Sequence, residues 1–236
     1  MNKKEFFYQQ VAKKGIEVSE EMKLQFAKYA DLLVEWNQKM NLTAIVDEQG
    51  IYEKHFLDSF LLAYAVDIKG SLCDVGAGAG FPSVPCLILY PELKVTIVEP
   101  LQKRCTFLNE VKKQLGLSNL TIMNARAEDF AKNHRESFDI VTARAVANLT
   151  MLSELCLPLV KKGGFFVALK GPGADDELQE AAFAIQTLKG SVERIDHQEF
   201  FGQQRNNLII KKVDSTPKKY PRPFAQIKKN PLRRKA

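Results

Sequence analysis

The chain has 236 residues, 45% of them hydrophobic, and carries a formal net charge of +6. This length suits one α/β domain with an appendage, and the apolar content is sufficient for a sizeable core. No stretch approaches the roughly eighteen uninterrupted apolar residues of a membrane span, and the basic start lacks the apolar run of a secretory signal. The four cysteines are scattered without a Cys-x-x-Cys pair, which argues against zinc binding or a disulfide framework. We therefore expect a cytoplasmic protein with free thiols.

The first 66 residues show helical periodicity. Apolar side chains recur at steps of three and four residues, the pattern of one buried helix face; they are Phe26, Tyr29, Leu32, Leu33 and Trp36. A connection follows, and Asp47 can cap a further helix that runs to about Ala65. We interpret the apolar stripe as core and predict that residues 1–66 form a helical extension packed on the next domain.

From Ser71 strands alternate with helices, which predicts a parallel sheet covered by helices on both faces. Five strands are expected at 71–75, 94–98, 120–123, 138–142 and 165–169, with a turn at 161–164 before the last of them. Two further strands, at 192–200 and 206–212, are joined by a short polar turn, which is typical of an antiparallel hairpin. Residues 67–215 are therefore predicted to form one α/β domain with a mostly parallel seven-stranded sheet.

A glycine-rich segment, 72–82, joins the first strand to a helix that Pro82 is expected to open, because proline is favoured at the first helical position. Three glycines in five residues allow positive φ angles and let a ligand approach the backbone; they are Gly76, Gly78 and Gly80. The dinucleotide fingerprint G-x-G-x-x-G requires its third glycine where Phe81 stands. The other common ligand of such a turn is S-adenosylmethionine, and a turn that only closes a strand–helix corner is the alternative.

Acidic residues support S-adenosylmethionine as the ligand of this turn. Asp74, just before the glycines, would repel a pyrophosphate but suits the cationic sulfonium and ammonium groups of S-adenosylmethionine. Ligands of open α/β sheets bind outside the carboxyl ends of the strands. Glu99 ends the second strand, 25 residues after Asp74, and can accept hydrogen bonds from both ribose hydroxyls. The segment 124–129 follows the third strand, where its backbone and side chains can contact an adenine edge or cap a helix.

Two cations also lie at strand ends. Arg144 follows the fourth strand and suits a cofactor carboxylate, a phosphate or a guanine edge; a structural salt bridge is the alternative. Lys170 ends the fifth strand. No Asn-Pro-Pro-Tyr element and no cysteine follow the fourth strand, which disfavours methylation of an amino group and covalent attack on a pyrimidine. The three histidines form no cluster, so no metal site is expected.

The positive charge is concentrated at the C-terminus. Eight lysines and arginines and no acid lie in 216–236, and without them the net charge of +6 becomes −2. Such a basic tail favours nucleic acid or another acidic surface as a partner; a solubilising tail is the alternative. Tyr220 and Phe224 can stack on unpaired bases. The prolines predict an extended rather than helical tail; they are Pro217, Pro221, Pro223 and Pro231.

Several motifs between about Trp36 and about Arg222 resemble, in order and spacing, the RsmG family, also called GidB. They are Trp36-Asn37, Asn41-Leu42-Thr43, His55-Phe56-Leu57-Asp58-Ser59, Asp74 to Pro82, Ala127-Glu128-Asp129-Phe130, Thr142 to Ala147, and Leu169-Lys170-Gly171. The family's members are bacterial Rossmann-like methyltransferases that use S-adenosylmethionine to methylate N7 of one guanosine in 16S ribosomal RNA. Two places depart from the family pattern: Pro100 stands where serine is common, and Pro223-Phe224-Ala225-Gln226 replaces the usual Lys-Pro-Gly-Thr-Pro.

The resemblance implies a cofactor site and partners. The cofactor positions that it carries over are Gly76, Phe81, Ala127, Glu128 and Arg144. Contacts with RNA are expected from Arg144, Lys170, Lys218, Lys219 and Arg222. The implied partner is 16S ribosomal RNA, the small ribosomal subunit or an assembly intermediate. The protein is expected to act as a monomer, without a membrane or a metal.

The resemblance also implies a mechanism without a catalytic side chain. N7 of guanine has a free lone pair and no proton to lose, so direct in-line attack on a methyl carbon needs positioning but no general base. Two rival functions are weaker. An NAD-dependent oxidoreductase is opposed by the glycine spacing and by Asp74. A non-catalytic ribosomal RNA-binding or ribosome assembly factor that retains the fold is opposed by the intact cofactor loop.

Overall fold

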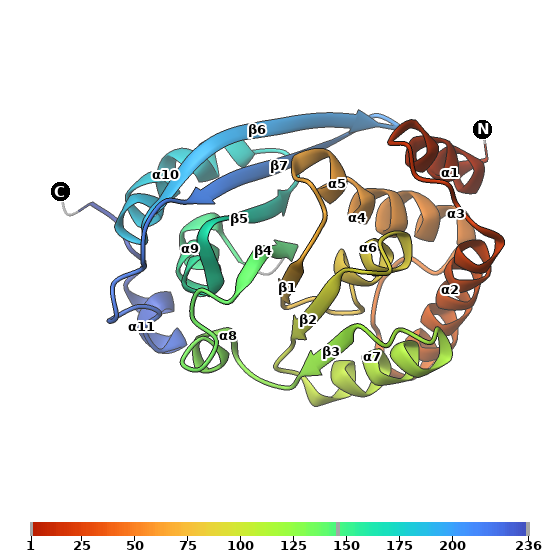
Figure 1. Cartoon of the computed structure of the whole chain (residues 1–236), viewed down its shortest axis with the longest axis horizontal. Helices are drawn as coiled ribbons and strands as arrows, with labels where there is room; N and C mark the ends of the chain where they lie inside the picture. Colours follow the sequence, from red (N-terminus) through yellow and green to blue (C-terminus); the bar gives the residue numbers. More distant parts are fainter. Residues whose placement is uncertain (1, 145–146, 235–236) are drawn as a thin grey trace.

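The structure, a computed structural model, describes residues 2–144 and 147–234. Seven strands form one sheet in the order β3-β2-β1-β4-β5-β7-β6 (Figure 1). The first five strands pair with one another in parallel; they are β1 (Ser71–Val75), β2 (Lys94–Val98), β3 (Leu120–Met123), β4 (Phe138–Arg144) and β5 (Val160–Lys170). The chain order reverses between β1 and β4, and ligands of open α/β sheets bind at such a switch point.

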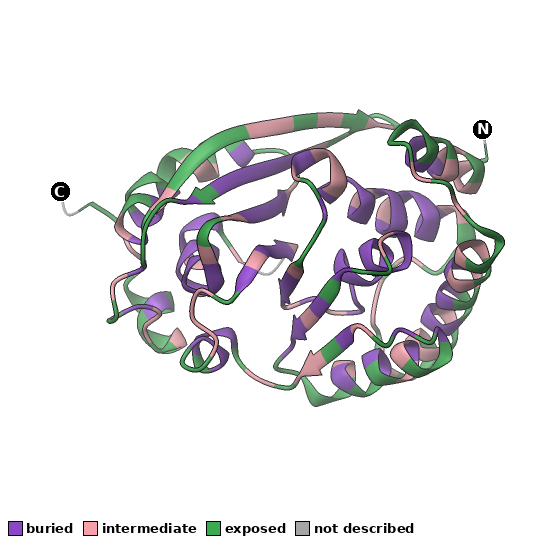
Figure 2. Cartoon of the chain, in the orientation of Figure 1, coloured by how far each residue is buried: buried purple, intermediate pink, exposed green. Residues whose placement is uncertain are grey.

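The last two strands, β6 (Gly190–Phe200) and β7 (Gln203–Lys212), form the predicted antiparallel hairpin. β7 lies inside the sheet, where it pairs antiparallel with β5 on one side and with β6 on the other. β6 is therefore the edge strand, and all of its residues are half-buried or exposed (Figure 2). The prediction of a mostly parallel seven-stranded sheet is confirmed.

Helices cover both faces of the sheet, and each face has its own hydrophobic cluster. Leu72 of β1 belongs to one cluster and Cys73 to the other, because successive side chains of a strand point to opposite faces. The first cluster includes α6 (Ser83–Leu89) and α7 (Gln102–Gln114). The second cluster includes α8 (Ala127–Phe130), α9 (Leu149–Cys156), the 3-10 turn η2 (Leu157–Leu159) and α10 (Ala174–Thr187).

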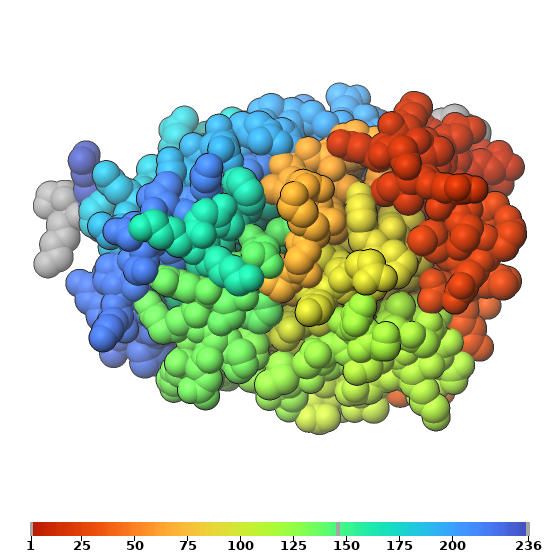
Figure 3. Space-filling view, viewed as in Figure 1, coloured from red at the N-terminus to blue at the C-terminus, as the bar shows by residue number. Residues whose placement is uncertain are grey.

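The N-terminal helices share the first cluster with α6 and α7. They are α1 (Lys3–Lys13), α2 (Glu20–Met40), α3 (Glu48–Ile51), the π-helical turn η1 (Tyr52–Leu57), α4 (Asp58–Phe60) and α5 (Leu62–Ala65). Phe26 is fully buried and lies 5.0 Å, between ring centroids, from both Phe7 and Phe56. Burial of one such side chain stabilises the fold by about 1.5–3 kcal/mol. The extension is thus part of the core of the molecule, and in Figure 3 it packs directly against the α6 and α7 region.

Two local predictions are wrong. Helix α6 begins at Ser83 with Pro82 as its N-cap, so the proline precedes the helix instead of opening it. Residues 161–164 belong to β5 and do not form a turn. Gly163 has a φ of 86°, and the pairing of β4 with β5 shifts between Phe138 and Ile140, so the extra residues are accommodated as an irregularity within the strand.

The prediction of an extended C-terminal tail is also wrong, because Phe224–Lys229 forms helix α11. The prolines bracket this helix without interrupting it, and Pro223 is its N-cap. Ile227 is buried in the second cluster, and α11 packs against α9. The side chain of Arg222 forms a two-pronged ion pair with Glu154 of α9, with N–O distances of 2.8 and 2.6 Å. The tail is therefore anchored to the domain through Arg222.

Ala145 and Val146, within the motif that follows β4, and Lys235, within the basic tail, lie outside the described residues. None of the described helices is long and apolar enough to cross a membrane.

Replacement of Arg222 by alanine should destabilise the protein, because the Glu154 carboxylate, which is 0% exposed, loses its charged partner. Breaking a buried ion pair in this way costs about 3 kcal/mol or more. The matched control is Lys218→Ala at an exposed position of the same tail, where a change within about 0.5 kcal/mol is expected. Urea unfolding measures both variants, and equal effects of the two substitutions would contradict the anchoring role.

Candidate functional site

The glycine turn after β1 combines two different kinds of glycine. Gly76, Gly78 and Gly80 all have positive φ angles, of 72°, 61° and 101°. A Cβ added at Gly78 would meet no heavy atom within 4 Å, whereas one at Gly80 would lie 2.7 Å from the Tyr29 hydroxyl and 2.8 Å from Val84. Gly78 therefore faces open space that a ligand can enter. Gly80 is required because the turn packs tightly on the N-terminal helices.

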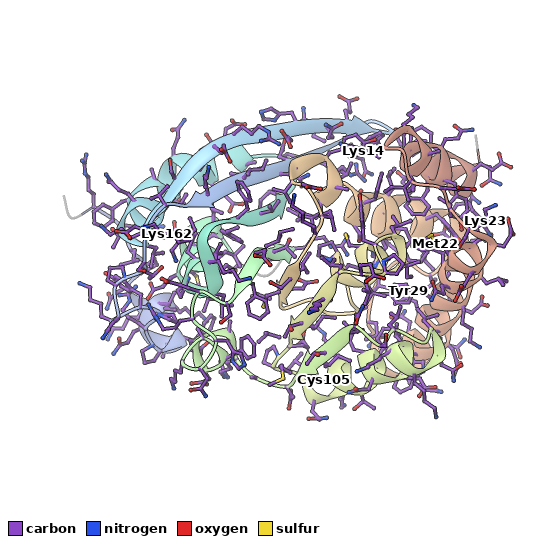
Figure 4. All side chains as sticks on the ribbon, in the orientation of Figure 1. Lys14, Met22, Lys23, Tyr29, Cys105 and Lys162 are labelled. Atoms are coloured by element: carbon purple, nitrogen blue, oxygen red, sulfur yellow. The ribbon has the colours of Figure 1, made fainter. Side chains whose placement is uncertain are left out.

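Tyr29 of α2 fixes the turn from the side of the N-terminal extension. Its hydroxyl donates a hydrogen bond of 2.5 Å to the carbonyl oxygen of Ala79. The ring is fully buried and lies 5.4 Å from that of Phe81 and 5.5 Å from that of Phe56. Figure 4 shows Tyr29 on the inner side of α2. The residue that the sequence pattern assigned to the core thus also holds the ligand turn in place.

Glu99, at the end of β2, lies directly against the glycine turn. One carboxylate oxygen accepts a hydrogen bond of 3.1 Å from the backbone N–H of Gly78, and the other accepts one of 3.0 Å from that of Leu101. The side chain of Asn124 donates to the carbonyl oxygen of Glu99 at 3.0 Å, which ties the segment after β3 to the same place. The structure therefore brings together the three strand ends at which the sequence placed a ligand.

Asp74 is fully buried beneath this turn. Its Oδ2 atom accepts a hydrogen bond of 3.2 Å from the backbone N–H of Ser83, while Oδ1 has no partner among the described residues. Burial raises the pKa of Asp74 to about 7, although the nearby positive charge of Arg144 opposes the change. A buried carboxyl oxygen without a donor fits a cationic ligand at the turn.

Arg144, at the end of β4, is held by residues of the N-terminal extension. Its guanidinium donates to the carbonyl oxygen of Lys54 at 3.3 Å and to Nδ1 of His55 at 3.4 Å, and it lies 5.0 Å from the centre of the Phe81 ring. No carboxylate of the described chain lies within ion-pair distance of it, so the alternative of a structural salt bridge is not supported. The positive charge is therefore free to act on a ligand.

His55 connects Arg144 to the first helices. Burial and the charge of Arg144 lower the pKa of His55 to about 4, so the ring is neutral at pH 7. Nδ1 can then accept from the arginine while the Nε2–H group donates to the Thr43 hydroxyl over 2.9 Å. The ring stacks on Phe81, with 4.4 Å between centroids. Sequence reasoning gave no role to His55 or Thr43, although both lie in motifs that carried the family resemblance.

The remaining predicted site residues are the cofactor positions at α8 and the predicted RNA contacts at Lys170 and in the tail. Ala127 and Glu128 are buried at the start of α8, after the segment tied to Glu99. Lys170 is only 10% exposed and forms an ion pair of 2.8 Å with Glu177, so much of its charge is already compensated. In the tail, Arg222 is anchored to a buried carboxylate, whereas two lysines are exposed, Lys218 and Lys219. Neither of these two lysines forms an ion pair with the residues that the structure describes.

The residues around the glycine turn fit S-adenosylmethionine. The turn is open at Gly78, an acid that can receive a ribose lies against it, and the unpartnered Asp74 oxygen suits a positive charge. Among the described residues, no group of three or more histidine, cysteine, aspartate or glutamate side chains is placed to hold a metal ion. The sheet order and the open turn at its switch point are those of a Rossmann-like methyltransferase.

Comparison with known proteins agrees with this class. The family model for rRNA small subunit methyltransferase G, called GidB, matches residues 22–208. The chain is 53% identical to ribosomal RNA small subunit methyltransferase G of Staphylococcus epidermidis strain RP62A, over 97% of this chain and 98% of that protein. It is 51% identical to the protein of the same name from Staphylococcus aureus strain RF122, with the same coverage of both chains. The chain belongs to the GidB family of rRNA small subunit methyltransferases.

A solved structure supports the fold at a much greater evolutionary distance. The crystal structure of M. jannaschii TYW2 in complex with AdoMet superposes with a TM-score of 0.56 at 14% identity, covering 72% of this chain and 80% of that one. At this identity the similarity concerns the fold alone.

The two glycines should respond differently to substitution by alanine. Gly80→Ala places a methyl group against buried Tyr29 and forces a φ of 101°, so the free energy of unfolding should fall by about 3 kcal/mol. Gly78→Ala should cost about 1 kcal/mol, because its φ of 61° lies in the left-handed region, but its methyl enters the open space. We expect weakened binding of S-adenosylhomocysteine, measured by calorimetry, for folded Gly78→Ala. Unchanged affinity would show that no ligand enters there.

The titration of Asp74 should appear in the pH dependence of stability. Its pKa is raised to about 7 in the folded protein, so its contribution is present below about pH 4 and is lost as the pH rises through 7. Without a ligand, the wild-type protein should therefore lose more stability between pH 5 and pH 8 than Asp74→Asn, which does not titrate. Urea unfolding at the two pH values tests this difference. Equal losses in the two proteins would mean that Asp74 is ionised throughout.

Proposed function

We propose that this protein transfers a methyl group from S-adenosylmethionine to N7 of a guanosine in 16S ribosomal RNA. The observation that carries the proposal is the open turn at Gly78, with Glu99 against one side and, at the neighbouring strand end, Arg144, which forms no ion pair with the described residues. Membership of the GidB family supports the substrate class. Such an enzyme meets its substrate, the small ribosomal subunit or its precursor, in the cytoplasm.

The chain's own residues would bind and orient the cofactor. Glu99 would receive the ribose hydroxyls in place of the Gly78 N–H group that it now accepts. Gly76, Gly78 and Phe81 would line the turn, and the Asp74 carboxylate would attract the positive charge. The buried segment at Ala127 and Glu128 would contact the adenine.

The chemistry requires positioning rather than proton transfer. When bound, S-adenosylmethionine supplies a methyl group on a sulfonium: the guanine N7 lone pair forms the new N–C bond, the C–S electron pair returns to sulfur, and the purine takes the positive charge. No proton leaves N7, so the neutral state of His55 is consistent with a positioning role. Arg144, fixed by His55 and Lys54, would orient one of the two reactants through its rigid, planar guanidinium.

The proposal is tested by incubation of the purified protein with S-adenosylmethionine and small ribosomal subunits that lack the modification, followed by mapping of the methylated base. We expect one N7-methylguanosine in 16S ribosomal RNA. Glu99→Ala should weaken S-adenosylhomocysteine binding by about one to two orders of magnitude, because charged hydrogen bonds are worth about 1.5–3 kcal/mol. Lys103→Ala, on an exposed face of α7, serves as the control. A folded wild-type protein that binds the cofactor but methylates no RNA would instead indicate an assembly factor.

A further inference from the structure

A cavity of about 860 Å³ opens at the carboxyl ends of β4 and β5. Arg144 forms part of its wall, so the cavity adjoins the site described above. The wall also includes Asp58, at the start of α4, and Arg205 of β7. Pockets that bind small organic ligands measure roughly 300–1,000 Å³. The cavity is therefore large enough for a nucleotide that has left the base stack.

The charged groups of the wall differ in how far they are already paired. Lys170 binds Glu177 at 2.8 Å and the carbonyl oxygen of Ala147 at 2.7 Å. Asp58 accepts one hydrogen bond of 2.8 Å, from Nε of Arg205 to Oδ1, and its Oδ2 atom accepts none from the residues that the structure describes. The Asp58 side chain is 20% exposed. The wall thus presents a partly buried carboxylate with spare acceptor capacity.

Asp58 lies close to Arg144, at the end of the site where methyl transfer is proposed. Asp58 follows His55 by three residues in one continuous helical run, and His55 contacts the guanidinium of Arg144. Asp58 and Arg144 line the same cavity, and their opposite charges attract. A base held by Asp58 would therefore lie between this carboxylate and the strand ends where the cofactor turn opens.

A carboxylate in such a cavity distinguishes guanine from the other bases. Guanine presents two adjacent donors, N1–H and the exocyclic amine, on the edge opposite N7, and one carboxylate can accept from both. Adenine and cytosine present an acceptor beside their amine, and uracil presents a single donor between two carbonyl groups. Unpaired RNA bases are commonly read on this edge. With its Watson–Crick edge on Asp58, a guanine directs N7 away from the carboxylate.

We infer that Asp58 recognises the target guanine by accepting hydrogen bonds from its N1–H and exocyclic amine in this cavity. The inference rests on the proposed function, and it adds a residue that determines base specificity. It also has a consequence for the rate. As N7 is methylated the purine becomes positively charged, so its N1–H and amine protons become stronger donors. The hydrogen bonds to Asp58 are then stronger in the transition state than in the ground state, which accelerates the reaction.

The experiment compares wild-type enzyme, Asp58→Asn and Arg205→Gln on small subunits reconstituted from 16S ribosomal RNA with either guanosine or a single inosine at the methylated position. Inosine keeps N7 and N1–H but lacks the amine. Wild-type kcat/KM should be about tenfold lower for inosine, and Asp58→Asn should lower kcat/KM for guanosine by about 10- to 100-fold. In Asp58→Asn the preference for guanosine over inosine should disappear. Arg205→Gln breaks the same ion pair but keeps the carboxylate, so it should retain that preference.

Melting temperature and S-adenosylhomocysteine affinity are measured alongside, and both should be nearly unchanged in Asp58→Asn. A guanosine preference in Asp58→Asn equal to that of the wild type would overturn the inference alone. The inference would also be overturned if Asp58→Asn and Arg205→Gln lost rate and melting temperature equally and both kept the preference for guanosine over inosine. The Asp58–Arg205 ion pair would then be purely structural. A wild-type enzyme that methylates neither particle would overturn the proposed function, and the inference with it.

Discussion

The site depends on a chain of hydrogen bonds that begins in the N-terminal helices and ends on Arg144. The side chain of Asn37 accepts a hydrogen bond of 2.8 Å from the backbone N–H of Thr43. The Thr43 hydroxyl is hydrogen-bonded to His55, and His55 is hydrogen-bonded to Arg144. These groups are removed from much of the solvent, so leaving one of them without a hydrogen-bond partner would cost free energy. In this series every group has its partner. The guanidinium at the end of β4 is thereby held over Phe81. Without the extension, the strand-end arginine would have no fixed direction.

The two carboxylates at the glycine turn differ in how fully they are hydrogen-bonded, and this difference determines which ligand charge the turn favours. Glu99 is 1% exposed but accepts two backbone N–H groups. Asp74 is fully buried, and among the described residues it has one hydrogen-bond donor, to Oδ2, and none to Oδ1. Burial of a carboxylate without full hydrogen bonding is unfavourable. A cation bound at the turn relieves this cost, whereas a pyrophosphate would increase it.

Residues of the site were predictable from the sequence where the argument was local. The glycine spacing, Asp74, Glu99 and Arg144 lie at or directly after the ends of strands that are recognisable by their apolar runs, and the carboxyl ends of parallel strands meet at one edge. His55 and Asp58 were not assigned, because they reach the site through packing between distant segments; Asp58 and Arg205 are 147 residues apart. The tail was mispredicted for a related reason: prolines report on the local backbone, whereas α11 is stabilised by the burial of Ile227 under α9.

The placement of β7 between β5 and β6 has a consequence for biosynthesis. β5 pairs with β7 and not with β6, so during synthesis it is an open edge until the chain has grown as far as Lys212. That edge includes a run of large apolar residues at Phe165 and Phe166, and an unpaired apolar edge readily adds strands from other chains. The nascent chain is therefore most prone to aggregation between emergence of β5 and emergence of β7. This interval is where a chaperone would protect it best.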